Sequence, residues 1–187
     1  MAWGCCLFYC QGFVRTRLTK ISFQHHAFLF LKIAILGAGW RNDKVVMAKI
    51  ALISCSKAKE AVKYPDTIKA ESLYKSPLFK KALKYAKETL KADRIYILSA
   101  KHHLLALDCQ ISEYDYTLNG QTADVIKAWS AEVRKQLSAE GVDFANDEIF
   151  ILAGKNYYKY LITDEFSNVK CLYRNMKIGQ ILQFLSE

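Results

Sequence analysis

The sequence lacks several patterns that mark common functional classes. Its 6 cysteines form no Cys-x-x-Cys pair, and those from Cys55 onward are scattered singly, which argues against a structural zinc site and a disulfide framework. No glycine-rich phosphate loop is present, so nucleotide hydrolysis of the P-loop type is disfavoured. Unpaired cysteines are typical of a reducing compartment, so we expect a cytoplasmic protein.

A long hydrophobic run is also missing. The most apolar stretch, Ala27 to Trp40, is interrupted by Lys32 and is shorter than the roughly 20 residues of a membrane span. No small-residue cleavage site follows it, as a signal peptide would require. We therefore expect no membrane partner, and a membrane anchor in this stretch is the less favoured alternative.

Residues 1–46 differ in character from the rest of the chain. They are rich in aromatic residues and cysteine and show no sustained helical or strand period. Met47 lies directly before the first strand-like run. We therefore expect Met47 to be the natural start, residues 1–46 to be a poorly ordered upstream extension, and residues 47–187 to form a single domain.

The positive charge of the chain is concentrated in that leading segment. The formal net charge is +9, but residues 1–46 carry six Lys or Arg residues against one Asp, which leaves +4 for residues 47–187. A mildly basic domain is compatible with a phosphate-bearing partner without requiring one.

Short apolar runs alternate with amphipathic stretches after Met47. The runs predict strands that are buried on both faces of a parallel sheet: Lys49–Ser56, Arg94–Ala100, Glu148–Gly154 and the weaker Asn168–Tyr173. The amphipathic stretches predict helices at 76–92, 122–141 and 178–187. The order predicts an α/β protein, with a three-layer α/β/α domain around a small, mainly parallel, four-stranded sheet.

The two longer helices carry local start and stop signals. Ser76-Pro77 marks the start of the first, Thr122 is a candidate N-cap of the second, and Gly141 ends the second. Apolar residues recur in the second helix at helical spacing and predict its buried face: Val125, Ile126, Trp129, Val133 and Leu137.

Polar loops follow the predicted strands. Loops that leave the carboxyl ends of parallel strands gather along one edge of the sheet, where such folds bind ligands. We therefore expect four segments to converge: 54–59, the stretch after Ala100, 154–160 and 173–177.

The first of these loops is cationic. Ser54 and Ser56 offer hydroxyl groups beside Lys57 and Lys59, and together these groups form a cradle for a phosphate oxygen. A solvated turn without function is the competing interpretation.

The second loop, after Ala100, begins with Lys101, His102 and His103. Adjacent histidines in an extended segment point to opposite sides, and no third ligand stands at a recognisable spacing. We therefore expect no metal and no cofactor. Lys101 is a candidate phosphate ligand.

The same loop continues into the sequence "SEYDYTL". In an extended segment Tyr114 and Tyr116 share one side and Asp115 takes the other. A carboxylate near Lys57 or Lys101 stays ionised and is able to orient water or to stabilise positive charge on a sugar. The alternative is a structural Asp that caps a turn.

The third loop, "LAGKNYYKYL", combines glycine with tyrosines. Gly154 permits close approach of the backbone to a ligand. Tyr157, Tyr158 and Tyr160 are able to stack on a base, although some of them are expected in the core.

Six ordered blocks between residues 48 and 187 resemble a bacterial and phage-borne domain family of unknown function: "ISCSKAK", "LYKSPLFKKALKYA", "ILSAKHHLLALD", "ISEYDYTL", "LAGKNYYKYL" and "IGQILQFL". That family is in turn similar to the YaaA-type peroxide stress proteins. The resemblance implies DNA binding, protection of DNA under oxidative stress, and a core like the uracil-DNA-glycosylase fold. The family blocks fall on Ser54, Ser56, Lys57, Tyr74, Ser76, Lys101, Leu104, Asp108, Tyr114, Asp115, Thr117, Gly154, Tyr158 and Gln180.

The chain departs from this family pattern at one place. Relatives usually carry an aromatic residue and then glycine where this chain has His102 and His103. Without that glycine, we do not expect an unusual backbone angle at position 103. No block reproduces a uracil-glycosylase catalytic motif.

Two function classes follow, with a small-metabolite enzyme as a weaker third. The first is an enzyme that hydrolyses an N-glycosidic bond in a nucleotide or nucleic acid. Its phosphate ligands would be Lys57 and Lys101, and its catalytic carboxylate Asp115 or Asp108. Tyr114 or Tyr158 would stack on the base. The second is a protein that binds DNA or a nucleotide through the same residues without chemistry.

Overall fold

The structure of the protein is a computed structural model, and it describes residues 47–186. The expectations for residues 1–46, including the poorly ordered extension and the minor alternative of a membrane anchor, lie outside that range. Among the helices within it, none has the length and apolar character needed to cross a bilayer.

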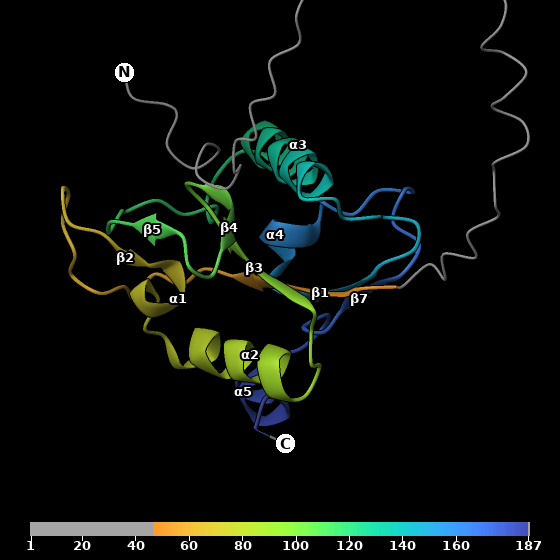
Figure 1. Cartoon of the computed structure of the whole chain (residues 1–187), viewed down its shortest axis with the longest axis horizontal. Coiled ribbons are helices and arrows are strands. Elements are labelled where there is room, and N and C mark those ends of the chain that lie inside the picture. The colour runs from red at the N-terminus through yellow and green to blue at the C-terminus, as the bar shows by residue number, and fades with distance from the viewer. Residues whose placement is uncertain (1–46, 187) are drawn as a thin grey trace, which may run out of the picture. The chain divides into compact units, whose positions relative to one another are not determined.

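A five-stranded, mostly parallel sheet forms the centre of the fold (Figure 1). The strand order is β4-β3-β1-β6-β7, with bounds β1 (Lys49–Ser54), β3 (Arg94–Ser99), β4 (His103–Ala106), β6 (Glu148–Leu152) and β7 (Val169–Cys171). The four strands expected from the apolar runs are β1, β3, β6 and β7, and they pair in parallel. The α/β class is confirmed.

The predicted strand number was wrong by one. The edge strand β4 pairs antiparallel with β3, because the chain reverses after Ser99 and brings Leu104 opposite Leu98. His103 takes a φ of 63° at this reversal, so the left-handed angle that we did not expect without glycine is present. A left-handed residue after a short turn is a common way to close a hairpin.

The three expected helices are present within a few residues of their predicted bounds: α2 (Pro77–Glu88), α3 (Ala123–Ala139) and α5 (Ile178–Phe184). Their start signals act as predicted, since the Ser76 hydroxyl accepts a hydrogen bond from the Phe79 N–H and the Thr122 hydroxyl accepts one from the Val125 N–H. Two single-turn helices, α1 (Ala70–Leu73) and α4 (Lys155–Tyr158), are too short to show a helical period in the sequence.

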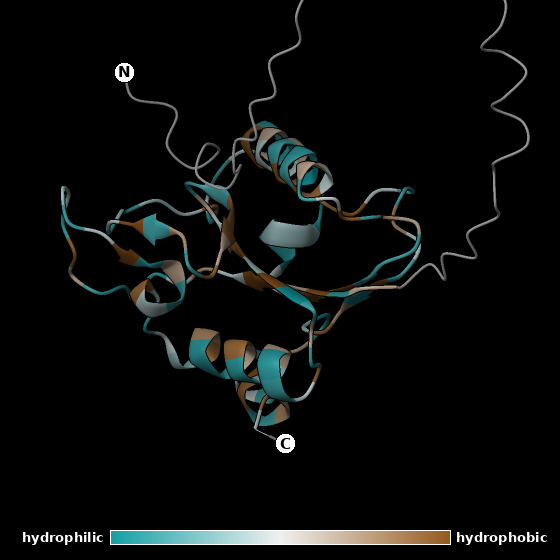
Figure 2. Ribbon diagram, in the orientation of Figure 1, coloured by the Kyte–Doolittle hydropathy of each residue, from teal (hydrophilic) through white to brown (hydrophobic). Residues whose placement is uncertain are grey.

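Helices cover both faces of the sheet. Ala51 and Ile53 of β1 belong to the core beneath α2 and α5, whereas Ile50 and Leu52 belong to the core beneath α3 and α4. Successive residues of a strand point to opposite faces, so a strand covered on both sides is apolar along most of its length, and Figure 2 shows brown, hydrophobic segments on the central strands. The three-layer arrangement follows from this pattern.

The buried face of α3 is narrower than predicted. Ile126, Trp129, Val133 and Leu137 are buried, but Val125 in the first turn is 38% exposed. The buried stripe runs at intervals of three and four residues from Ile126, which leaves Val125 at its edge.

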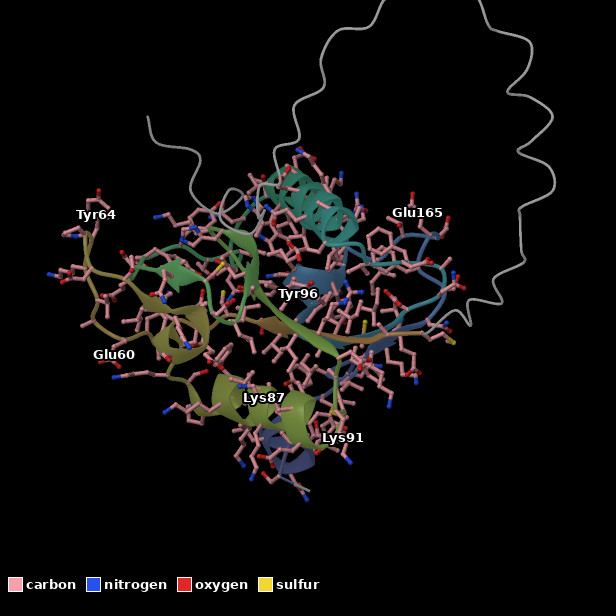
Figure 3. All side chains as sticks on the ribbon, in the orientation of Figure 1. Glu60, Tyr64, Lys87, Lys91, Tyr96 and Glu165 are labelled. Atoms are coloured by element: carbon pink, nitrogen blue, oxygen red, sulfur yellow. The ribbon has the colours of Figure 1, made fainter. Side chains whose placement is uncertain are left out.

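A small second sheet projects from the domain. It consists of β2 (Ile68–Lys69) and β5 (Gln110–Ile111), paired antiparallel. The chain that leads into β2 carries Tyr64 at its outer end (Figure 3). Neither strand was predicted, because two residues give no alternation to detect.

Candidate functional site

A cavity of about 600 Å³ lies at the carboxyl ends of β1 and β6. Three of its walls come from segments far apart in the sequence, namely residues 54–59 after β1, 115–119 of the polar segment and 154–157 after β6. Parallel strands bring these loops to one edge of the sheet. The ligand edge expected from the sequence is therefore hollow.

Hydrogen bonds and a β-bridge hold the loop after β1. The Cys55 N–H donates to the Leu98 carbonyl, which continues the pairing of β1 with β3. The Ser56 hydroxyl donates to the Ala58 carbonyl at 2.9 Å, and Lys59 pairs with Tyr74 in an isolated β-bridge. These bonds present the exposed Lys57 side chain at the cavity.

Tyr114, a predicted ligand contact, is an interior residue. Its hydroxyl lies 2.8 Å from the Tyr74 hydroxyl and 2.8 Å from the Ser99 hydroxyl, and the residue is only 7% exposed. Burial raises the pKa of Tyr114 well above its usual range. Lys59 Nζ lies 4.3 Å from the centroid of the Tyr114 ring, within the reach of a cation–π contact, so Tyr114 holds a cavity lysine in place.

The two residues after Tyr114 face the cavity. Asp115 and Tyr116 are exposed and line it. The expectation that Tyr114 and Tyr116 share one side and that Asp115 takes the other was wrong. Residues 112–117 pair with no strand, so the alternation of a strand is not imposed on them.

The loop after β6 contributes a tyrosine, but not the predicted one. Tyr157 lines the cavity, its hydroxyl lies 3.3 Å from Cys55 Sγ, and its ring packs edge-on against Trp129 at 5.5 Å. Burial raises the pKa of Tyr157, and the Cys55 thiol raises it further. Tyr158 lies outside the cavity lining and, like Tyr157, packs against the core beneath α3.

A hydrogen bond connects two of the walls. Asn156 Nδ2 donates to Asn119 Oδ1 at 3.1 Å, and both residues line the cavity. This bond ties the start of α4 to the polar segment that carries Asp115.

The structure brings five of the predicted site residues together around the cavity: Ser54, Ser56, Lys57, Asp115 and Gly154. The remaining four lie outside its lining: Lys101, Asp108, Tyr114 and Tyr158. Lys101 is exposed in the turn between β3 and β4, and Asp108 is exposed in the turn before β5. The roles assigned to all nine stay predictions.

Sequence reasoning missed several residues of the cavity. Lys155 and Asn156 line the cavity and lie in the loop after β6, where only the glycine and the tyrosines were predicted as ligand contacts. Asn119 precedes Gly120, which has a φ of 82°, and this Asn-Gly turn signal was available in the sequence. Tyr116 was considered only as the neighbour of Asp115.

The charge of the cavity favours an anion. Lys57, Lys59 and Lys155 line it together with a single carboxylate, Asp115. Three cations against one anion in a concave site give a positive potential. Within residues 47–186, no group of three His, Cys, Asp or Glu side chains is placed to hold a metal ion.

Comparison with known proteins gives a family but no activity. A family model described as a family of unknown function, DUF6884, matches residues 50–187. No curated protein and no solved structure gives a significant match. These comparisons show no link to the YaaA-type proteins, so that part of the resemblance stays a prediction.

Proposed function

Since this chain belongs to the DUF6884 family of unknown function, we propose a function from the site itself: the cavity binds a nucleotide, and Asp115 assists hydrolysis of its N-glycosidic bond. The nucleotide is either free or part of a nucleic-acid strand. The observation that carries the proposal is the combination of three lysines and one carboxylate in one cavity.

The size and polarity of the cavity support this ligand. A volume of about 600 Å³ falls in the usual range of small-molecule sites. Lys57, Lys59 and Lys155 offer point charges for phosphate oxygens. The first turn of α2 reaches the cavity at Leu78.

Asp115 is the residue proposed to act on the bond. An ionised carboxylate beside the sugar stabilises the oxocarbenium-like transition state or orients the attacking water. Lys101, Asp108, Tyr114 and Tyr158 receive no direct role in this proposal, because they lie outside the cavity lining. A nucleotide substrate also agrees with the expectation from the sequence blocks that the protein binds DNA, while the likeness to YaaA-type proteins and to the uracil-DNA-glycosylase fold stays a prediction.

Removal of the Asp115 charge tests the chemistry. We expect Asp115→Asn to lower kcat about 10²- to 10⁴-fold, the usual contribution of a general acid or base, while nucleotide affinity changes by less than about threefold. The measurement is release of free base from nucleotides and from single-stranded and duplex oligonucleotides.

Asp108→Asn is the matched control, because Asp108 is exposed and lies outside the lining of the cavity. This variant should keep the turnover of the unmodified protein. Undiminished turnover in Asp115→Asn would remove Asp115 from the mechanism.

The lysines test binding separately. We expect Lys57→Ala to weaken nucleotide affinity about 5- to 10-fold and to flatten its dependence on salt, because one phosphate contact is lost. Lys101→Ala, at an exposed lysine outside the cavity lining, should leave affinity unchanged. Isothermal titration calorimetry at several salt concentrations measures both, and equal effects of the two variants would argue against phosphate binding at this edge.

Binding without chemistry is the second candidate, and one observation favours it. Glycoside hydrolases ordinarily use two carboxylates, whereas Asp115 is the single carboxylate among the described residues that line the cavity. A protein of this second kind would show the Lys57 effect on affinity and no base release from any substrate.

A further inference from the structure

We propose that the nucleobase of the bound nucleotide enters a second, largely apolar cavity beside the first. This inference rests on the proposed function, because it assumes that the lysines hold the phosphate. It goes further by naming the part of the site that selects a nucleotide over a simple phosphate ester.

The second cavity, which we name the annex, has a volume of about 330 Å³. It lies between the end of β1, the first half of α2 and the start of α5, and its walls include Phe79, Ala82, Leu152, Tyr173 and Ile178. Most of these side chains are buried, so the walls of the annex are set by the core packing of α2 against the sheet.

The annex and the first cavity share a boundary. Residues 54–57, Leu78 and Asn119 line both of them. One ligand is therefore able to occupy both spaces, with its sugar near the loop that follows β1.

The two spaces differ in charge, and this difference orients the ligand. Lys57 is the one charged residue among the described residues that line the annex, whereas the first cavity also has Lys59, Lys155 and Asp115. A phosphate group is therefore favoured in the first cavity. The uncharged ring of the same ligand is favoured in the annex, where its burial removes apolar surface from water.

The walls of the annex suit a flat ring with polar edges. The Phe79 and Tyr173 rings form part of the annex wall, although little of either side chain is exposed. Ile178 is 64% exposed, so a ring seated beside it would cover apolar surface that now contacts water. Ser76 and Asn119 supply polar atoms at the boundary for hydrogen bonds to the edge of the ring.

The competing position for the base is the Tyr116 ring. Tyr116 is 40% exposed and lines the first cavity, so a base could stack there in the open. A base in the annex predicts that annex variants weaken nucleotide binding and that a Tyr116 variant does not. A base on the Tyr116 ring predicts the reverse.

The test compares the affinities of three probes: inorganic phosphate, ribose 5-phosphate and a nucleoside 5′-monophosphate. The full chain carries Asp115→Asn to prevent turnover, and calorimetry measures the affinities. We expect the nucleotide to bind at least about tenfold more tightly than ribose 5-phosphate, the usual effect of burying a base against aromatic side chains.

Two variants of the annex should abolish that gain and leave the affinity for ribose 5-phosphate unchanged. Ala82→Leu fills the annex from α2. Ile178→Asn removes the exposed apolar wall of the annex, and Ile178 is 64% exposed and not part of the buried core, so this variant keeps the test valid if Ala82→Leu fails to fold. Val125→Asn, at the exposed Val of α3, is the matched control and should retain the full gain.

The outcomes separate the two proposals. Failure of ribose 5-phosphate and phosphate to bind would contradict the proposed function. If ribose 5-phosphate binds but the nucleotide binds no more tightly, only the base position is overturned. The base position is also overturned if the tighter binding of the nucleotide is lost in Tyr116→Ala and retained in Ile178→Asn. Tighter binding of a short single-stranded oligonucleotide than of its abasic counterpart supports the annex. This result identifies a nucleic-acid strand as the source of the nucleotide.

Discussion

Tyr114 shows how a single residue connects the interior with the site. Its hydroxyl contacts Tyr74 and Ser99, and Ser99 also accepts a hydrogen bond from the His102 N–H. Asp115 follows Tyr114 in the chain, and Lys59 lies over the Tyr114 ring. The position of both charged groups therefore depends on a tyrosine that lies outside the lining of the cavity.

Deletion of the Tyr114 hydroxyl should destabilise the fold. We expect Tyr114→Phe to lower the free energy of unfolding by about 1–3 kcal/mol, because the buried Tyr74 hydroxyl loses its hydrogen-bond partner. The double variant Tyr74→Phe/Tyr114→Phe should cost less than the sum of the single variants, since no orphaned tyrosine hydroxyl is left. Urea denaturation measures all three, and strict additivity would contradict a shared hydrogen bond.

The start of α2 has a similar double role at the scale of the element. The Ser76 hydroxyl lies 3.1 Å from the Phe79 N–H that it accepts from, and Pro77 occupies the first helical position, where it is favoured because it needs no hydrogen-bond acceptor. Ser76 and Leu78 also line the annex. The signal that starts this helix therefore lies at the site.

Removal of the cap should weaken α2 more than the equivalent change weakens α3. We expect Ser76→Ala to lower the free energy of unfolding by about 1 kcal/mol. Thr122→Ala should have a smaller effect, because the Thr122 hydroxyl lies 3.5 Å from the Val125 N–H, at the limit of a hydrogen bond. Thermal denaturation of the two variants checks this order, and a larger loss in Thr122→Ala would reverse the interpretation.

At the scale of the whole molecule, we expect two histidines to make the stability depend on pH. His102 and His103 lie half-buried where the edge strand β4 meets α3. Burial lowers the pKa of His102, and the Lys101 and His103 charges lower it further. Burial also lowers the pKa of His103, while Glu132 on α3 acts in the opposite direction.

A lowered histidine pKa means that the unfolded chain binds more protons than the folded one. The free energy of unfolding should therefore fall as the pH drops below the ordinary histidine pKa of 6.5. We expect a declining denaturation midpoint between about pH 7 and about pH 5, and a flatter profile for His102→Gln/His103→Asn. Asn tolerates the left-handed backbone at position 103. An unchanged slope in the double variant would assign the decline to other groups.

The sequence predicted the central strands and the longer helices because their signals are local. The apolar runs of β1 and β3 reflect cover on both faces, and the caps at Ser76 and Thr122 act within one turn. The edge strand β4 was not predicted, because its pairing depends on a reversal at His103 with no glycine to mark it. The two-residue strands β2 and β5 are too short for a period.

The candidate site was predicted in outline and not in detail. The order of strands placed the loops at one edge, and Ser56, Lys57 and Asp115 indeed line the cavity. The sequence did not predict which of two adjacent tyrosines faces the cavity, since Tyr157 and not Tyr158 lines it. Side-chain direction in an irregular segment depends on contacts with distant residues, such as the Cys55 thiol beside Tyr157.

The sequence by itself therefore determined the α/β class, the starts of the longer helices and the edge of the sheet where polar loops gather, because periodicity and capping act between residues a few positions apart. Only the tertiary structure decided that Tyr114 is buried, that Lys155 and Asn119 join the site, and that an apolar annex lies beside it. Those features arise where α2, the sheet and the polar segment pack together, and such packing joins residues that no local pattern relates.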